Sequence, residues 1–153
     1  MTASNDHDIK ILNGLIEATI DSADGYTEAA KEADNSRYTS IFQQRATERR
    51  QVTQLLQQHV RALGGTPEDD GTVLAKAHRV FVDLRSKMTS HEDTAIVDEV
   101  ERGEDHIKGK YEDALKDSDV TVGTRRVIDE AYGPVKSGHD QMRDLKHALH
   151  GSR

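Results

Sequence analysis

Residues 38–67 read YTSIFQQRATERRQVTQLLQQHVRALGGTP. Apolar residues recur in this stretch every three or four positions, and this spacing places them on one face of an α-helix. The stretch ends at Gly64 and Gly65, which permit the left-handed cap of a helix, and Pro67 prevents the helix from continuing. The pattern therefore predicts a helix over residues 37–64 that buries one face.

Three other long stretches have the same period and extend the prediction to a helical bundle. They predict helices over residues 6–34, 91–116 and 121–149, and a shorter amphipathic stretch predicts a helix over residues 72–89. The turn near residue 35 is so short that the first two helices should pack as antiparallel neighbours. Pro134 should kink the last helix, because proline removes one backbone hydrogen bond.

The connection over residues 65–91 decides between two bundle topologies. A helix of about 18 residues is ~27 Å long, so this connection can return the chain to the opposite end of the bundle. The second and third long helices can then run parallel, in the up-down-down-up order of a ferritin-like four-helix bundle with an additional short crossover helix. An all-antiparallel five-helix bundle is the competing topology. We expect the crossover arrangement, in a single all-α domain over residues 1–153.

Composition narrows the class of protein. The chain has 153 residues, a formal net charge of −7 and no cysteine, so it has no disulfide or thiolate metal site. The negative charge disfavours non-specific binding to nucleic acid. Neither a signal peptide nor an apolar run of the roughly 18 residues that a membrane span requires is visible. We expect a cytoplasmic protein that binds neither nucleic acid nor membrane. A homo-oligomer and a protein partner both stay open.

The polar residues on the buried faces do not form the metal site that this fold usually holds. Di-metal bundles use Glu-x-x-His on two of their helices, but no glutamate here is followed by histidine three positions later. Helical phasing instead places Arg45 and Arg49 near the centre of one apolar face and Glu104 near the centre of another. Because an unpaired buried charge is very costly, we predict a buried ion-pair network of Arg45, Arg49 and Glu104.

A non-standard site for iron or manganese is the alternative to this ion-pair network. Its candidate ligands are Glu17, Glu48, Glu101, Glu104 and His139. Two guanidinium groups on the same face would repel a divalent cation, so we expect no cofactor. The sequence has no phosphate-binding loop or nucleophile elbow, and we assign no catalytic residue. A helical module that binds a partner protein is a third, weaker reading.

Several short motifs add a family resemblance over about residues 9–116. They are Leu12-Asn13-Gly14-Leu15-Ile16-Glu17, Asp21, Gly25-Tyr26, Leu63-Gly64-Gly65, Glu101-Arg102-Gly103-Glu104-Asp105, Tyr111 and Ala114-Leu115. Together they resemble a bacterial domain-of-unknown-function family that is grouped with the ferritin-like, rubrerythrin-like superfamily. The resemblance implies a four-helix bundle in the bacterial cytosol and an association with stress, and it supplies no ligand set. We therefore expect a non-catalytic ferritin-like bundle without an intact di-metal site. An atypical iron or manganese protein, with oxidoreductase or metal-storage activity, is the alternative.

Overall fold

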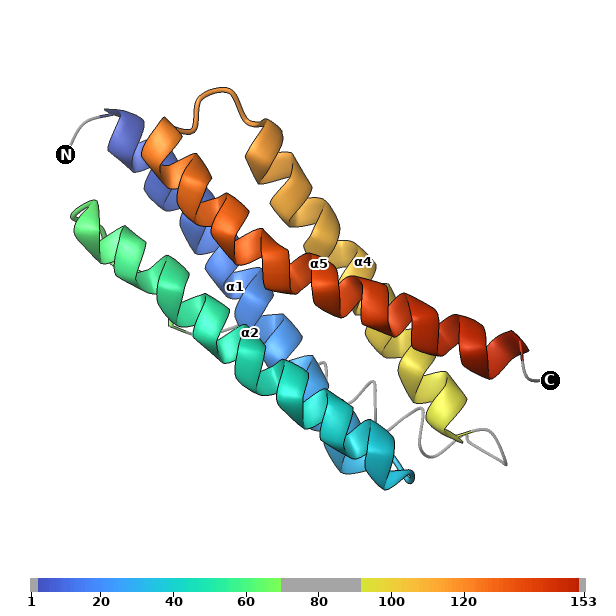
Figure 1. The fold of residues 1–153 in the computed structure, drawn as a ribbon. Helices are drawn as coiled ribbons and strands as arrows, with labels where there is room; N and C mark the ends of the chain where they lie inside the picture. The colour runs from blue at the N-terminus through green and yellow to red at the C-terminus, as the bar shows by residue number, and fades with distance from the viewer. Residues whose placement is uncertain (1–2, 70–91, 152–153) are drawn as a thin grey trace.

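The computed structural model describes residues 3–69 and 92–151, and these residues form four long α-helices (Figure 1). The helices are α1 (Ala3–Glu32), α2 (Ser36–Ala62), α4 (Glu92–Lys116) and α5 (Val122–Gly151). No β-strand occurs in the described residues. The prediction of an all-α four-helix bundle is confirmed. The crossover helix predicted over residues 72–89 lies outside the described residues.

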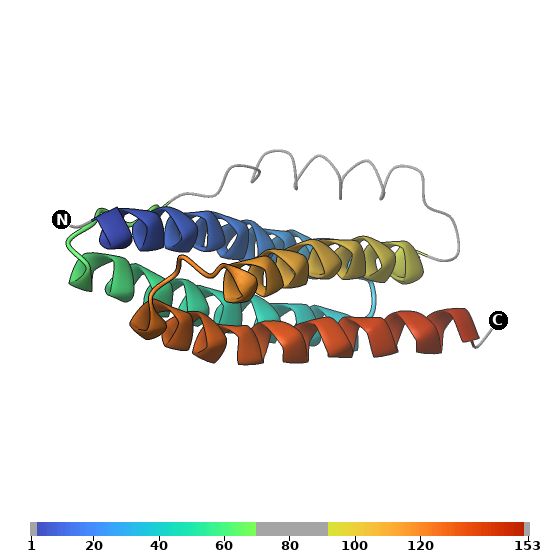
Figure 2. The same ribbon diagram turned by 90° about the horizontal axis from the view of Figure 1, so that it is seen from above.

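The helices α2 and α4 run in one direction, and α1 and α5 run in the other (Figures 1 and 2). Contacts at the helix ends show the same order. The carboxylate of Asp93, at the start of α4, accepts hydrogen bonds from the backbone N–H groups of Asp34 and Asn35, in the turn between α1 and α2. At the opposite end, His7 of α1 lies 2.9 Å from Asp117, directly after α4. This is the order of directions expected for the one-crossover bundle.

The turn after α2 has the geometry that its glycines predict. Gly64 has a φ of 87°, the backbone N–H of Gly65 bonds to the carbonyl of Val60, and that of Gly64 bonds to the carbonyl of Arg61. These two bonds form a Schellman motif. A Cβ at Gly65 would lie 2.7 Å from the side chain of Ile9, so this position also brings α1 and α2 into close contact.

Two apolar clusters fill the bundle, one toward each end. The first contains Leu12, Leu15, Ile16, Ala18, Val52, Leu56, Val60, Ile107, Tyr111, Ala114, Val120, Ile128, Ala131 and Val135. The second contains Tyr26, Ala29, Ala30, Phe42, Ala46, Ile96, Val97, Val100 and Met142. On each helix the two clusters are separated by about one and a half to two turns, and that stretch contributes the polar residues described below. The core is therefore divided in the middle by a polar layer.

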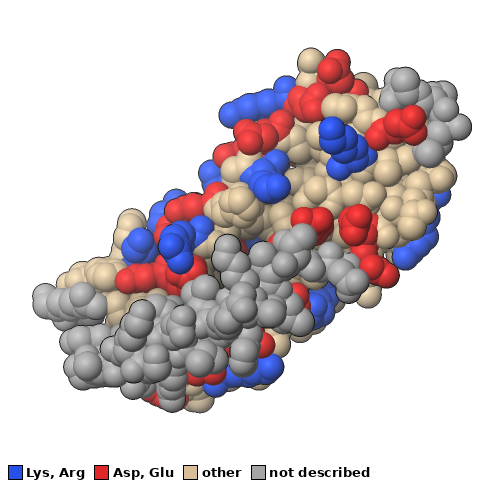
Figure 3. All heavy atoms as spheres, turned by 180° about the vertical axis from the view of Figure 1, so that it is seen from behind, with Lys and Arg blue, Asp and Glu red and all other residues tan. Residues whose placement is uncertain are grey.

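The last helix passes through Pro134 without interruption, and the predicted kink takes the form of a gentle bend near the middle of α5 (Figure 1). Acidic and basic side chains are interspersed over the described residues on the face drawn in Figure 3. None of the described helices is both long enough and apolar enough to cross a membrane.

A carboxylate of α1 holds the start of α5. Asp8 is fully buried, and its two oxygens accept hydrogen bonds from the backbone N–H of Thr121 at 3.1 Å and from the hydroxyls of Thr121 and Thr124 at 2.5 and 2.8 Å. Burial alone would raise the pKa of Asp8, but these hydrogen bonds outweigh it and lower the pKa. The hydroxyl of Thr124 donates to Asp8 and so accepts from Nε2 of His59, 2.9 Å away, which links α2 to the same end.

Replacing Asp8 by Asn should lower the free energy of unfolding by about 1–2 kcal/mol at pH 7, because an amide is a weaker partner for three donors. The pKa of Asp8 is lower in the folded state, so its contribution is complete above the unfolded-state pKa and is lost as pH falls through the folded-state pKa. The difference between wild type and variant should therefore shrink between about pH 5 and pH 2. Urea unfolding followed by circular dichroism measures it, with the exposed acid Asp129→Asn as control. If the free energies of unfolding of wild type and variant differed by the same amount at about pH 5 and at about pH 2, this explanation would be wrong.

Candidate functional site

The polar layer in the middle of the bundle is built around Arg49, whose side chain is fully buried. Its Nη2 donates to Oε2 of Glu104 at 2.8 Å and to the carbonyl of Val135 at 3.4 Å, and its Nη1 donates to Oγ of Ser22 at 2.9 Å. The guanidinium carbon lies 5.5 Å from the centre of the Tyr26 ring. All four helices therefore contribute to one arginine.

The fourth helix makes room for this arginine with a glycine. A Cβ at Gly138 would lie 2.3 Å from Nη2 of Arg49 and 3.4 Å from Oε2 of Glu104. No side chain larger than hydrogen fits between α5 and the ion pair without moving one of them. The ion pair therefore requires a glycine at position 138. The sequence pattern alone did not identify this residue.

The electrostatics of the layer keep its members in fixed charge states. Burial alone would lower the pKa of Arg49, but the charge and hydrogen bond of Glu104 outweigh it and raise the pKa. Burial, followed by the charge of Glu104, raises the pKa of Tyr26 well above its ordinary range. Burial also raises the pKa of Tyr111 to about 12, and its hydroxyl lies 2.8 Å from that of Thr19. The arginine therefore stays charged and both tyrosines stay neutral at physiological pH.

Two buried polar atoms of the layer have no hydrogen-bond partner within the described residues: the Tyr26 hydroxyl and Nε of Arg49. The ring of Tyr26 faces the guanidinium group of Arg49. A cation over an aromatic ring at this distance is a favourable contact when both are desolvated.

The second predicted arginine lies at the rim of the layer. Nη1 of Arg45 is 2.8 Å from Oε1 of Glu48, one turn along α2, and its Nε donates to Gln141 at 2.7 Å. The predicted three-residue network of Arg45, Arg49 and Glu104 thus takes the form of two separate pairs. Because Arg45 is half-buried, its guanidinium reaches the α2–α5 surface, where neighbours other than Glu104 are closer.

Of the five candidate metal ligands, the structure brings Glu101 and His139 together and adds Asp105. One ligand atom of each lies within 4.8 Å of the other two. Nε2 of His139 is 2.7 Å from Asp105 and Nδ1 is 3.3 Å from Asp140, while Lys146 lies 3.4 Å from Glu101. Asp105 follows Glu101 by four residues on α4, a spacing that places both carboxylates on one face. This group, here called the seam cluster, lies between α4 and α5.

The other three candidates lie outside the seam cluster. Glu104 is paired with Arg49, Glu48 is paired with Arg45, and the half-buried Glu17 belongs to neither metal-compatible group found in the described residues. The predicted set of five ligands is therefore not assembled at one place.

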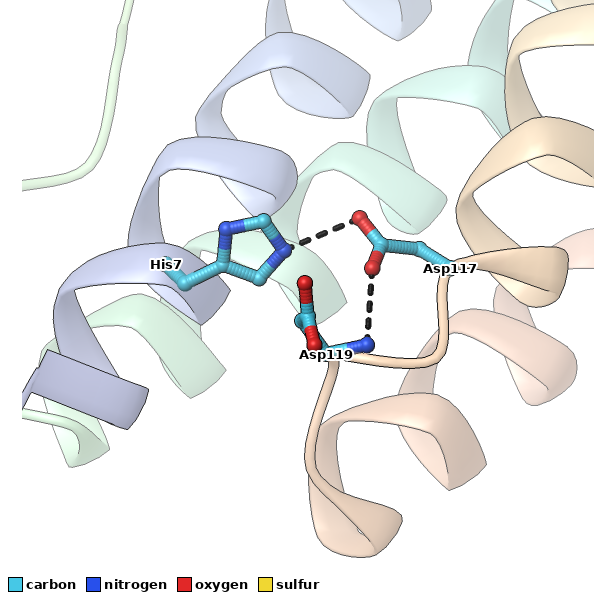
Figure 4. A group of neighbouring side chains, drawn as sticks. All are labelled: His7, Asp117 and Asp119. Carbon is cyan, nitrogen blue, oxygen red and sulfur yellow. Dashed lines mark hydrogen bonds and ion pairs between the residues drawn. The ribbon is translucent and has the colours of Figure 1, made fainter.

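A second group of potential ligands lies at the end of the bundle, and we call it the end cluster. It consists of His7, Asp117 and Asp119, with one ligand atom of each within 4.8 Å of the others (Figure 4). Oδ1 of Asp117 accepts a hydrogen bond from the backbone N–H of Asp119 at 2.9 Å, and this bond followed by that from His7 lowers the pKa of Asp117. Sequence spacing could not reveal this cluster, because its histidine is 110 residues from Asp117.

Replacing Arg49 by Leu should lower the free energy of unfolding by about 3 kcal/mol, because Glu104 would remain buried without its partner. Chemical denaturation of the purified protein measures this loss. A double variant, Arg49→Leu with Glu104→Leu, should be less destabilised than Arg49→Leu alone, because no charge is left in the core. Arg102→Leu, at an exposed position of α4, is the control. A loss below half a kcal/mol for Arg49→Leu would place that side chain in water.

Gly138→Ala should destabilise the protein by about 1–3 kcal/mol, because the new methyl group would overlap the guanidinium group of Arg49. The matched control is Gly103→Ala, at a helical position where a Cβ meets nothing within 4 Å. That change should stabilise the protein by about 0.5–1 kcal/mol, since alanine is the better helix former. Thermal unfolding of the two variants compares them directly, and a shift of the same sign in both would refute the packing argument.

Comparison with known proteins gives one positive result. A search of curated proteins finds no match to this chain. The model of a protein family, Domain of unknown function (DUF2383), matches residues 7–117. The matched region begins at the histidine of the end cluster, contains both partners of the central ion pair and ends directly after α4. Because the match covers most of the chain, this four-helix protein belongs to the DUF2383 family.

Proposed function

We propose that this chain is a non-catalytic helical-bundle protein of the bacterial cytoplasm, with a ferritin-like fold whose centre is closed by an ion pair. On this proposal it acts through its surface or by self-association, in a role associated with stress. The burial of Arg49 is the observation that supports the proposal most strongly. A fully buried guanidinium group occupies the middle of the bundle, between the two apolar clusters.

The position of this arginine matters because di-metal bundles hold their ions between the helices, with carboxylates that project inward from all four. Here the corresponding layer contains a guanidinium group that stays positively charged. A pair of unit charges about 4 Å apart interacts with roughly 4 kcal/mol at an effective dielectric constant of about 20, and a divalent ion would be repelled about twice as strongly. Glu104, the carboxylate that reaches Arg49, is already neutralised by it. The layer is therefore suited to holding four helices together.

The neutral tyrosines also support a structural role for the central layer. Tyr26 and Tyr111 border the layer with pKa values raised by burial, so neither is poised to exchange a proton near neutral pH. Catalytic acids and bases have pKa values close to the operating pH. The groups of the central layer thus have the properties of a structural ion pair.

The alternative is an atypical metal protein that takes iron or manganese, with oxidoreductase or storage activity. The seam cluster favours it, because Glu101, Asp105 and His139 offer two carboxylates and an imidazole within reach of one ion. The carboxylate of Asp140 next to the second ring nitrogen of His139 is also a common arrangement around a ligating histidine. Two positive charges disfavour a metal ion at this place. Lys146 lies 3.4 Å from Glu101, and Arg49 of α2 contacts the inner side of α4 through Glu104.

Elemental analysis of protein purified from iron- and manganese-supplemented culture tests the proposal. We expect much less than one iron or manganese ion per chain. About two ions per chain, lost in Glu104→Gln, would show a di-metal centre and overturn the proposal. About one ion per chain that is lost in His139→Gln, but kept in Glu104→Gln and in the exposed control His106→Gln, would establish the seam cluster as the metal site.

A further inference from the structure

The end cluster joins two parts of the chain that are far apart in sequence. His7 lies in the first turns of α1, and Asp117 and Asp119 lie in the turn between α4 and α5. Figure 4 shows the three side chains converging on one another. Nε2 of His7 is 2.9 Å from Oδ2 of Asp117, and each of the three offers a ligand atom within 4.8 Å of the others.

The geometry points to a site for one zinc ion, which we propose is held by His7, Asp117 and Asp119. Zinc accepts imidazole nitrogen and carboxylate oxygen at about 2.0–2.2 Å, so ligand atoms around a tetrahedral ion lie roughly 3.3 Å apart. Because the ligand atoms already lie within 4.8 Å of one another, no separation has to shorten by more than about 1.5 Å to reach this geometry. A mixed nitrogen and oxygen set favours zinc over magnesium, which prefers oxygen ligands in octahedral geometry.

The exposure of the cluster leaves room for the fourth ligand. Asp119 is exposed, and His7 and Asp117 are half-buried, so a water molecule can complete the coordination shell from solvent. Within the described part of the chain, the carboxylate of Asp119 has no hydrogen bond or ion pair. It is therefore available to an ion without loss of an existing contact.

Neighbouring groups hold the ligands in place. The backbone N–H of Asp119 fixes one oxygen of Asp117, so the other oxygen faces His7. Next to His7, the buried carboxylate of Asp8 adds negative charge close to the site. Arg125 is a positively charged neighbour of the cluster. Its Nη2 donates hydrogen bonds to the backbone carbonyl of Asp117 at 2.6 Å and to that of Val120 at 3.2 Å. The carboxylates of Asp8, Asp117 and Asp119 outnumber the single guanidinium group of Arg125, so the local electrostatic potential favours a cation.

Zinc at this site would tie α1 to the turn between α4 and α5 and would stabilise the native state by binding it selectively. The test uses the full chain after treatment with a chelator. Calorimetric titration with zinc chloride should give one ion per chain at this site, and saturating zinc should raise Tm by roughly 5 °C. The same concentration of magnesium should leave Tm unchanged.

Two variants locate the ion. Asp119→Asn changes an exposed side chain and leaves the fold intact, and His7→Gln removes the nitrogen ligand. Each should weaken zinc binding at least tenfold and abolish the rise in Tm. Asp129→Asn and His147→Gln, which change an exposed acid and an exposed histidine of α5, should bind zinc like the wild type.

Three outcomes would overturn the site. Unchanged zinc affinity in Asp119→Asn would remove the end cluster as the ligand set. Loss of zinc in His139→Gln or His147→Gln, with binding kept in Asp119→Asn, would place the ion at the seam cluster or near the C-terminus. A rise in Tm with magnesium that Asp119→Asn abolishes would show a carboxylate site for hard cations in place of the zinc site.

Discussion

A guanidinium group that is completely removed from water must be paired, and the rest of this structure is organised around that constraint. Arg49 meets its requirement with a carboxylate from α4, a hydroxyl from α1, a carbonyl from α5 and the face of an aromatic ring. These partners come from all of the helices that surround it. Since breaking a buried pair costs far more than the pair itself contributes, the arginine specifies how the helices are arranged more than it adds to their stability.

The two ends of the bundle use a related device. At one end the carboxylate of Asp93 binds backbone N–H groups of the α1–α2 turn, and at the other Asp8 binds the first residues of α5. In both cases a side chain from one helix satisfies the turn at the end of another. The exposed backbone donors near a helix end are ordinarily satisfied by a local cap. The start of α2 also has a local cap, because the side chain of Asn35 accepts a hydrogen bond from the backbone N–H of Arg37 at 2.9 Å, so the contacts from distant segments supplement local capping.

The fold was largely predictable from the sequence, and the site was predictable only in part. Apolar spacing located the four long helices, and the Gly64-Gly65 pair located the end of α2, because these are local properties of the chain. Helical phasing also placed Arg49 and Glu104 on buried faces that could meet. Phasing gives a direction around a helix but not a position along a neighbouring one, so it could not separate Arg45 from the central pair. For the same reason helical phasing did not identify Asp105, Gly138 or the end cluster, because their roles depend on contacts between segments that are distant in sequence.

The contacts of α4 have a consequence for how the helices can move. This helix is fixed near its start by Asp93, in its middle by Glu104 and directly after its end by Asp117, and each of these acids meets a partner on a different segment. Sliding α4 by one helical turn, about 5.4 Å, would detach all three acids at once. Intermediate positions would leave Arg49 without its carboxylate. The axial register of α4 is therefore all-or-none, and a signal transmitted through this bundle would have to travel by rotation or opening of helices, not by a piston-like shift.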